Sequence, residues 1–282
     1  MVNAVLEGVP RDANREAVVE FSVPAVPVTQ LPFALTETSV LAIIPARYQS
    51  ARLPGKALVD IAGRPMIEHV YRRAAAAKSL DFVLVATDDE RIARAVDAFG
   101  GVACMTASTH GSGTDRLAEV AAAVPCRLIV NVQGDEPMLD PAVIDAAVEP
   151  LRRDPSIEIG TAARPLRDHA ELANPNVVKV VRDGQGFGLY FSRAPIPYGR
   201  DDVAAPIARV HIGLYVYRRD TLLRLSRLPP GPLERTETLE QLRALENGVR
   251  INVVDTTYHS VEVNTQEDLE RVRHLMLTGA RG

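Results

Sequence analysis

The sequence predicts an α/β protein with a mainly parallel, doubly wound sheet and an inserted antiparallel β subdomain. Three mainly apolar runs alternate with segments of helical periodicity, as expected for strands that are covered on both faces. These runs are Val40–Ile44, Phe82–Ala86 and Arg127–Val132. After about residue 157 the pattern changes to short alternating strands with glycine turns, which is typical of antiparallel pairing. We therefore expect one domain over residues 40–282, with the antiparallel insertion at roughly 157–217.

Composition and charge exclude several classes of protein. A formal charge of −4 over 282 residues argues against bulk nucleic-acid binding. No run approaches the roughly 18–20 apolar residues of a membrane span, so we expect no membrane partner. Cys104 and Cys126 are the only cysteines and form no Cys-x-x-Cys pair. Buried reduced thiols and a cytoplasmic location are therefore expected.

Residues 1–39 differ from the rest of the chain. Proline is interleaved with apolar residues over 23–32, a pattern that sustains neither a helix nor sheet pairing. A basic start followed by a continuous apolar segment, which would indicate a signal peptide, is missing. We predict a disordered or loosely packed extension.

A basic loop follows the first predicted strand. Pro45 ends strand pairing, and Arg47, Arg52 and Lys56 follow within eleven residues. The carboxyl end of a parallel strand is where α/β sheets bind ligands. The loop has neither a Gly-x-Gly-x-x-Gly nor a Walker pattern, so its positive charge comes from side chains. Such cations suit a triphosphate that loses pyrophosphate, whereas the alternative is a solvated basic loop.

Further elements follow in order. We expect helices at 64–75, after the capping segment Thr87–Asp89 to about Phe99, at 116–123 and after the Asp140-Pro141 cap, with a short strand at 102–105. In the second half we expect a hairpin of 177–181 and 187–191, strands at 210–217 and 250–254, a helix at 236–246 and a last helix capped by Thr265. The antiparallel strands suggest a lid or a dimerisation layer.

Two polar loops accompany the basic loop. The segment Ser108–Asp115 contains Ser112 and Gly113, whose backbone and hydroxyl groups could recognise a base or sugar. Asp135 follows Gly134 off the end of a central strand, where Mg²⁺ would favour carboxylate oxygens. The alternative for Asp135 is a solvated turn residue that caps the next helix.

The basic loop also carries a resemblance. Pro-Ala-Arg-Tyr-x-Ser-x-Arg-Leu-Pro-Gly-Lys, at residues 45–56, resembles the nucleotide-binding signature of the 3-deoxy-manno-octulosonate cytidylyltransferase (CMP-Kdo synthetase) family. Similar motifs recur from about Val40 to about Arg273. The resemblance implies a single cytidylyltransferase domain that activates an acidic eight-carbon sugar with CTP for lipopolysaccharide biosynthesis. The products are the CMP-sugar and pyrophosphate, and the sugar's anomeric hydroxyl attacks the α-phosphorus in line.

The resemblance also implies roles for individual residues. The catalytic set is Arg47, Arg52, Lys56 and Asp135, and the nucleotide-binding set is Pro45, Ala46, Arg47, Ser50, Lys56, Ser112, Gly113 and Gln133. The sugar-binding set is Arg193 for the carboxylate and His211, Tyr215, Glu240 and Gln241 for hydroxyls, from the motifs Phe-Ser-Arg, His-x-Gly-x-Tyr and Leu-Glu-Gln-Leu-Arg. A structural histidine and a solvated Glu240 are the alternatives. A homodimer and a Mg²⁺ cofactor held by Asp135 and Asn264 are further expectations.

The metal assignment rests on a departure from the family. The family pattern Val-Asp-Thr-Pro-Glu-Asp-Leu reads Val-Asn-Thr-Gln-Glu-Asp-Leu here, so Asn264 replaces the second metal-binding Asp. An amide oxygen can coordinate magnesium but brings no charge. Glu262 shares a strand face with Asn264 and is an alternative source of that charge. Functional alternatives are a cytidylyltransferase for an 8-amino analogue or neuraminate, a UTP-dependent pyrophosphorylase, or a catalytically impaired nucleotide-sugar-binding regulator.

Overall fold

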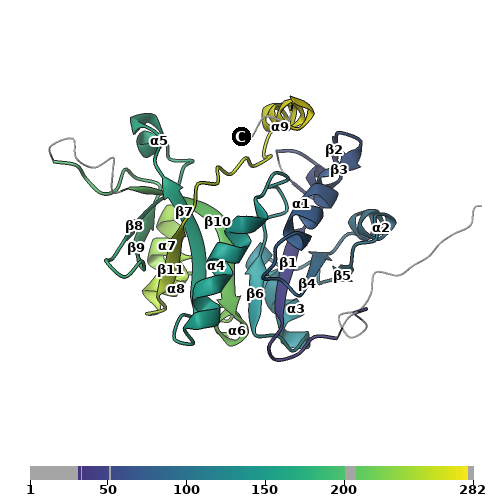
Figure 1. The fold of residues 1–282 in the computed structure, drawn as a ribbon, viewed down its shortest axis with the longest axis horizontal. Helices are drawn as coiled ribbons and strands as arrows, with labels where there is room; N and C mark the ends of the chain where they lie inside the picture. The colour runs from purple at the N-terminus through teal and green to yellow at the C-terminus, as the bar shows by residue number, and fades with distance from the viewer. Residues whose placement is uncertain (1–30, 33, 51, 201–207, 279–282) are drawn as a thin grey trace, which may run out of the picture.

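The computed structural model describes residues 31–32, 34–50, 52–200 and 208–278. Their centre is a nine-stranded sheet with the order β11-β7-β10-β6-β1-β4-β5, to which the β8–β9 hairpin adds through β10 (Figure 1). Its strands are β1 (Val40–Ala46), β4 (Phe82–Thr87), β5 (Ala103–Met105), β6 (Leu128–Asn131), β7 (Ile159–Pro165), β8 (Lys179–Arg182), β9 (Gly188–Ser192), β10 (Arg209–Arg218) and β11 (Ile251–Asp255). A small separate sheet pairs β2 (Asp60–Ile61) with β3 (Arg64–Pro65).

Strand directions confirm the predicted fold class. β1 pairs in parallel with both β4 and β6, β4 pairs in parallel with β5, and β11 pairs in parallel with β7. β10 runs antiparallel to β6, β7 and β8, and the β8–β9 hairpin is antiparallel as predicted. The antiparallel strands after residue 157 thus extend the main sheet, and β10 brings their residues next to β6.

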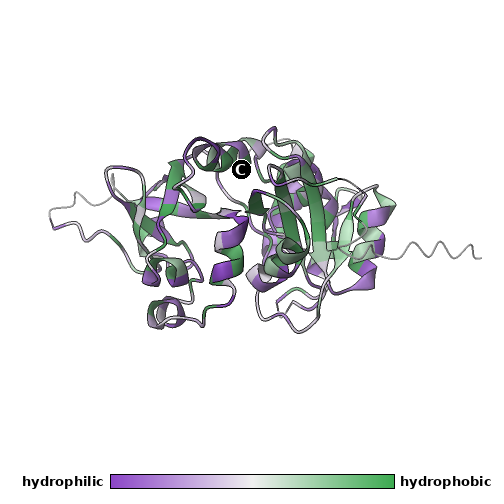
Figure 2. Cartoon of the chain, turned by 90° about the horizontal axis from the view of Figure 1, so that it is seen from below, coloured by the Kyte–Doolittle hydropathy of each residue, from purple (hydrophilic) through white to green (hydrophobic). Residues whose placement is uncertain are grey.

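Helices cover both faces of the sheet, and Figure 2 shows hydrophobic strands between helices with hydrophilic outer surfaces. α1, α2 and α4 pack on one face, whereas α3, α6 and α8 pack on the other. β1 accordingly divides its side chains, with Ala42 and Ile44 on the first face and Leu41 and Ile43 on the second. The helices are α1 (Met66–Ala75), α2 (Glu90–Ala98), α3 (Gly113–Ala123), α4 (Pro141–Arg153), α5 (His169–Ala173), α6 (Arg219–Leu225), α7 (Pro232–Glu237), α8 (Leu242–Glu246) and α9 (Gln266–Thr278).

Side-chain caps define several helix starts. Asp140 caps α4 by accepting a hydrogen bond from the Ala142 amide at 3.0 Å, as predicted. Thr265 caps α9, where its hydroxyl accepts from the Asp268 amide at 3.2 Å. α3 begins at Gly113, three residues before the predicted start, because Ser112 and Asp115 form a reciprocal capping box.

The prediction of one helix over Thr236–Glu246 is wrong. Two short helices, α7 and α8, occupy this region, and Thr238 between them adopts a left-handed conformation with φ of 53°. The left-handed residue ends α7, and Arg193 donates hydrogen bonds to the carbonyls of Glu237 (2.8 Å) and Thr238 (3.4 Å) at this break. The break places Glu240 in the link between the two helices.

A third hydrophobic cluster lies away from the sheet. It joins α9 to the β2–β3 hairpin through Ile61, Met66, Val263 and Leu269, with other side chains packed around them. Arg273 on α9 donates hydrogen bonds of 3.0 and 2.7 Å to the Asp60 carbonyl. Figure 1 shows α9 beside this hairpin.

The start of the described chain also contacts the core. Leu31 and Leu35 pack against the cluster on the α3 face of the sheet. Most of the extension predicted over residues 1–39 lies outside the described residues. Among the helices that are described, none has the length and apolar character needed to cross a membrane.

Candidate active site

A cavity of about 390 Å³ opens at the carboxyl ends of β1 and β6. It is where the sequence predicted a ligand site, because the loops after these two parallel strands meet there. Its lining residues are Pro45, Ala46, Arg47, Ser50, Arg52, Lys56, Ala57, His110, Gly111, Ser112, Gly113, Arg116, Gln133, Gly134, Asp135 and Asn264. The structure therefore brings together every residue that was predicted for the catalytic, nucleotide-binding and metal-binding sets.

The basic loop after β1 folds back on itself. Gly55 adopts a positive φ of 67°, which favours glycine, and its amide donates to the Tyr48 carbonyl at 3.0 Å. The Arg91 guanidinium lies over the Tyr48 ring at 3.3 Å from the ring centre. This fold brings Lys56, in the 3-10 helix Lys56–Leu58, back to the end of β1.

Lys56 lies at the centre of the site. Its Nζ donates to Asp135 Oδ2 at 2.8 Å and to Asn264 Oδ1 at 3.2 Å. Arg52 Nη2 donates to the same Asn264 oxygen at 3.1 Å. The side chains of Lys56 and Asp135 are only 18% and 23% exposed, so little water screens this ion pair. Asp135 and Asn264 thus direct two oxygens at one cation, the Lys56 ammonium.

Further acidic groups surround this pair. Glu262 is an exposed residue, and its Oε2 accepts a hydrogen bond from Asn264 Nδ2 at 2.9 Å. Burial, with smaller contributions from the Glu262 and Asp135 charges, raises the pKa of Glu136 to about 8. The Val263 amide donates to the Asp135 carbonyl at 2.9 Å and holds the two acidic segments together. Glu262 is therefore a direct neighbour of Asn264.

Gly134 sets the distance between the loops after β1 and β6. A Cβ atom at this position would lie 2.9 Å from the Pro45 carbonyl oxygen, closer than real Cβ contacts. Any side chain would therefore push the Asp135 loop away from the basic loop. The glycine is needed for this close approach of two backbones.

Two polar cavity residues, His110 and Arg116, were missed by the sequence analysis. His110 Nε2 is hydrogen-bonded to Glu119 Oε2, and Arg116 forms an ion pair with Asp88 at 3.2 Å. Arg116 is 4% exposed, so its charge is buried at the cavity wall. A single histidine in a glycine-rich loop has no spacing that predicts a function. Its position within the Ser108–Asp115 loop, which was predicted to contact a base or sugar, could have identified His110.

A second cavity, of about 20 Å³, lies on the α3 face of the sheet. Three residues of the predicted sugar-binding set line it, namely Tyr215, Glu240 and Gln241. Arg243 and Thr114 lie beside them. Burial raises the pKa of Tyr215, so its hydroxyl stays protonated and can donate.

Arg193 and His211 are not among the residues that line this second cavity. The Arg193 guanidinium donates to the carbonyls of Glu237, Thr238 and Pro175. His211 Nε2 hydrogen-bonds the Thr161 hydroxyl at 3.0 Å. Burial lowers the pKa of His211 to about 3, so the ring is uncharged at neutral pH.

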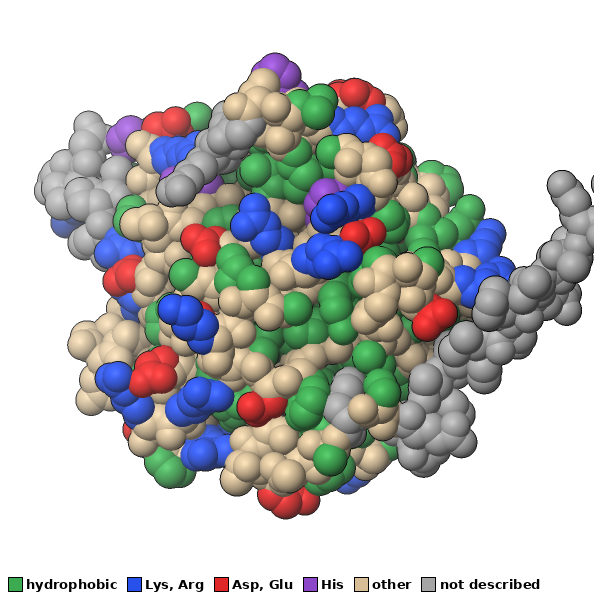
Figure 3. Space-filling model, turned by 45° about the vertical axis from the view of Figure 1, so that its right-hand side comes forward, with side chains coloured by type: hydrophobic (Ala, Val, Ile, Leu, Met, Phe, Trp, Pro, Cys, Tyr) green, Lys and Arg blue, Asp and Glu red, His purple; other side chains and the backbone are tan. Residues whose placement is uncertain are grey.

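Charged side chains of both signs share the surface of the molecule. On the face drawn in Figure 3, Lys and Arg side chains are interspersed with Asp and Glu side chains. This face therefore carries no wide surface of a single charge.

Comparison with known proteins places the chain among nucleotidyltransferases. Residues 41–251 match the model of the family described as cytidylyltransferase. A 3-deoxy-manno-octulosonate cytidylyltransferase from Solibacter usitatus is 55% identical over 236 residues, which cover 84% of this chain and 94% of the relative. One from Syntrophotalea carbinolica is 57% identical over 242 residues, 83% of this chain and 97% of the relative.

Solved structures agree with this placement. A CMP:2-keto-3-deoxy-manno-octonic acid synthetase complexed with CTP superposes with a TM-score of 0.83 and 44% identity, over 86% of this chain and all of the other. A 4-diphosphocytidyl-2C-methyl-D-erythritol synthase from Anaerococcus prevotii shares the fold at 16% identity, with a TM-score of 0.56. By its sequence relatives and its matched family model, the chain belongs to the 3-deoxy-manno-octulosonate cytidylyltransferase family.

Proposed function

We propose that this protein is an enzyme that joins CMP from CTP to 3-deoxy-manno-octulosonate and releases pyrophosphate, a step of lipopolysaccharide biosynthesis. The observation that carries the proposal is the convergence of Lys56 and Arg52 on Asp135 and Asn264 at the end of β1. The names of the relatives, and the CTP bound to the similar solved structure, support the choice of substrates.

The cations of the basic loop would hold the triphosphate. Arg47, Arg52 and Lys56 line one cavity, where they can neutralise the charge that develops on the leaving pyrophosphate. Ser112, Gly113 and Gln133 line the same cavity and offer backbone and side-chain groups to the nucleoside. Positioning and charge neutralisation supply most of the catalysis in this mechanism.

Magnesium is the cofactor that we propose. Asp135 and Asn264 would hold it, since their oxygens already converge on a single cation, the Lys56 ammonium. When bound, the ion would neutralise phosphate charge and lower the pKa of an oxygen that it contacts. Glu262, hydrogen-bonded to the Asn264 amide, adds negative charge beside this pair.

The acidic sugar would bind on the α3 side. Tyr215, Glu240 and Gln241 line the second cavity and offer hydroxyl, carboxylate and amide groups to the sugar's hydroxyls. Arg193 remains the proposed partner of the sugar's carboxylate. The uncharged His211 would act as a hydrogen-bonding group rather than as a cation.

Location and assembly are separate proposals. Both cysteines are free and buried, and burial raises the pKa of Cys104 to about 11 and that of Cys126 to about 12. Such unreactive thiols support a reducing, cytoplasmic compartment. The homodimer stays a prediction, which light scattering of the purified protein tests.

Pyrophosphate release tests the function. We expect release with CTP, 3-deoxy-manno-octulosonate and magnesium, and none when the sugar is omitted. Parallel reactions with the 8-amino analogue, with N-acetylneuraminate or with UTP test the other enzymes. Binding of CTP without release under every condition would indicate a regulator and would contradict the proposal.

A further inference from the structure

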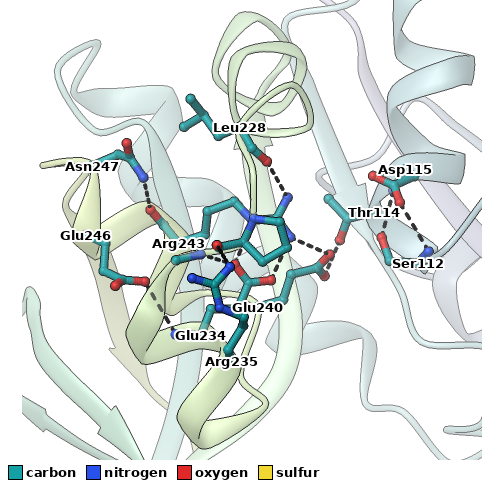
Figure 4. A network of polar contacts seen from close by, with 12 residues as sticks. Ser112, Thr114, Asp115, Leu228, Glu234, Arg235, Glu240, Arg243, Glu246 and Asn247 are labelled. Carbon is teal, nitrogen blue, oxygen red and sulfur yellow. Dashed lines mark hydrogen bonds and ion pairs between the residues drawn. The ribbon is translucent and has the colours of Figure 1, made fainter.

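Consecutive residues at the start of α3 face two different cavities. Ser112 and Gly113 line the large cavity, whereas Thr114 lines the small one. The Thr114 hydroxyl donates a hydrogen bond of 2.6 Å to Glu240 Oε2, across 126 residues of sequence. Figure 4 shows the two side chains pointing toward each other from α3 and from the link between α7 and α8. This hydrogen bond joins two residues that line the small cavity, and Thr114 directly follows the residues that line the large one.

The Glu240 carboxylate is held from one side only. Oε1 lies 3.9 Å from the Arg243 guanidinium and accepts no hydrogen bond within the part of the chain that the structure describes. Arg243 is itself fixed by hydrogen bonds of 2.8 and 2.6 Å to Glu234. Since the Glu240 side chain is 40% exposed, Oε1 can accept a hydrogen bond from a bound hydroxyl while Oε2 stays with Thr114.

The nucleotide side of this connection is ordered. The Ser112 hydroxyl accepts from the Asp115 amide at 3.1 Å, and the Asp115 carboxylate accepts from the Ser112 amide at 3.2 Å. Thr114 lies between these two residues and is 8% exposed. A nucleotide that contacts Ser112 and Gly113 therefore acts on the same helical turn that holds Thr114.

We propose that Thr114 is a positioning residue that couples the two substrate sites, so that CTP and the acidic sugar each strengthen the binding of the other. This inference rests on the proposed function. A nucleotide that contacts Ser112 and Gly113 stabilises the arrangement of the first turn of α3 in which the Thr114 hydroxyl holds Glu240 for a sugar hydroxyl. Coupling between two sites is reciprocal, so the sugar strengthens nucleotide binding by the same factor.

Calorimetric binding with an unreactive nucleotide tests the coupling. The dissociation constant of 3-deoxy-manno-octulosonate is measured alone and with saturating α,β-methylene-CTP, which cannot release pyrophosphate. For the wild-type protein we expect the nucleotide to tighten sugar binding by about fivefold or more. Thr114→Val should reduce this factor to about one while the affinity for the nucleotide alone changes by less than about twofold.

Thr114→Ser keeps the hydroxyl but lacks the methyl group, so it should keep the coupling. If packing of the methyl group caused the coupling, this variant would lose it. Thr114→Ala replaces the valine variant if the latter does not fold. Wild-type coupling in both Thr114→Val and Thr114→Ala would overturn the inference, as would sugar binding by the wild-type protein that ignores the nucleotide. Pyrophosphate release by the wild-type protein separates these outcomes from failure of the proposed function.

Discussion

The proposed nucleotide side and the proposed sugar side of the site differ in how their polar groups are used. On the nucleotide side, a cavity of about 390 Å³ is lined by Arg47, Arg52 and Lys56, whose charges come from one short loop. On the sugar side, the cavity is about 20 Å³, and Arg193 already donates to three carbonyls. In the first region the cations bond to side chains of the same cavity, Asp135 and Asn264, whereas in the second region Arg193 bonds to backbone carbonyls and so also shapes the fold.

Replacing Lys56 by alanine is expected to have the largest effect. The variant removes the cation between Asp135 and Asn264 and should raise the barrier by about 2.7–4 kcal/mol, as for the loss of one preorganised donor. Steady-state pyrophosphate release measures kcat, and circular dichroism checks folding. Lys78→Ala, at an exposed position, is the control. An unchanged kcat would assign the basic loop to the solvated surface.

Arg193→Lys tests the sugar side of the comparison. Lysine cannot reach the carbonyls of Glu237, Thr238 and Pro175 together, so the site should lose a charged hydrogen bond worth about 1.5–3 kcal/mol. The KM for the sugar should rise while the KM for CTP stays unchanged. Arg153→Lys, on an exposed part of α4, is the control. Equal changes in both KM values would show that the two sides do not differ in this way.

Asn264→Asp sharpens the metal assignment. A second carboxylate opposite Asp135 should lower the magnesium concentration for half-maximal activity by roughly tenfold, because hard cations favour anionic oxygen. A magnesium titration of thermal stability gives a second readout that does not depend on turnover.

Glu262→Gln separates the two sources of negative charge near the metal site. If Glu262 supplies the negative charge that Asn264 lacks, Glu262→Gln should need a higher magnesium concentration for half-maximal activity. An unchanged magnesium titration would show that Glu262 does not replace the charge that is missing at Asn264. If Asn264→Asp leaves the magnesium titration unchanged, Asn264 is not a metal ligand.

The smallest expected effect concerns the pH dependence of stability. Burial holds the pKa of His211 at about 3 in the folded protein, below its ordinary value of 6.5. The unfolded chain therefore binds this proton more readily, and stability present above pH 6.5 is lost as the pH falls toward 3. Thermal melts at pH 7 and pH 5.5 should show a loss smaller by about 1 kcal/mol in His211→Gln than in the wild type. His274→Gln, at an exposed position, should retain the wild-type loss.

Local sequence predicted the residues of the basic loop that line the large cavity. Pro45, the three cations and Gly55 are close in sequence, and the strand before them is a plain apolar run. The residues that give this loop its charge and its turn are thus close together in the sequence. Only the meeting of Lys56 with Asp135 and Asn264 required the three-dimensional structure, because it joins positions far apart in the chain.

The sugar side was harder to predict because distant partners decide its conformation. The 236–246 segment has the composition of a helix. Thr238 nevertheless adopts a left-handed conformation, where Arg193 donates to the carbonyls of Glu237 and Thr238. Helix propensity is weak compared with such tertiary contacts. The early start of α3, in contrast, was available in the sequence, since Ser112 and Asp115 have the spacing of a capping box.

The third hydrophobic cluster has a consequence for thermal inactivation. It contains Val263 next to Asn264, and Leu53 and Met138 pack against it from the basic loop and from the chain after Asp135. The basic loop, the Asp135 segment and the Asn264 segment of the large cavity therefore pack on a cluster that is separate from the core of the sheet. Local opening of a small cluster costs less free energy than global unfolding. Catalysis is thus expected to fade on warming while the sheet is still intact, and to return on cooling.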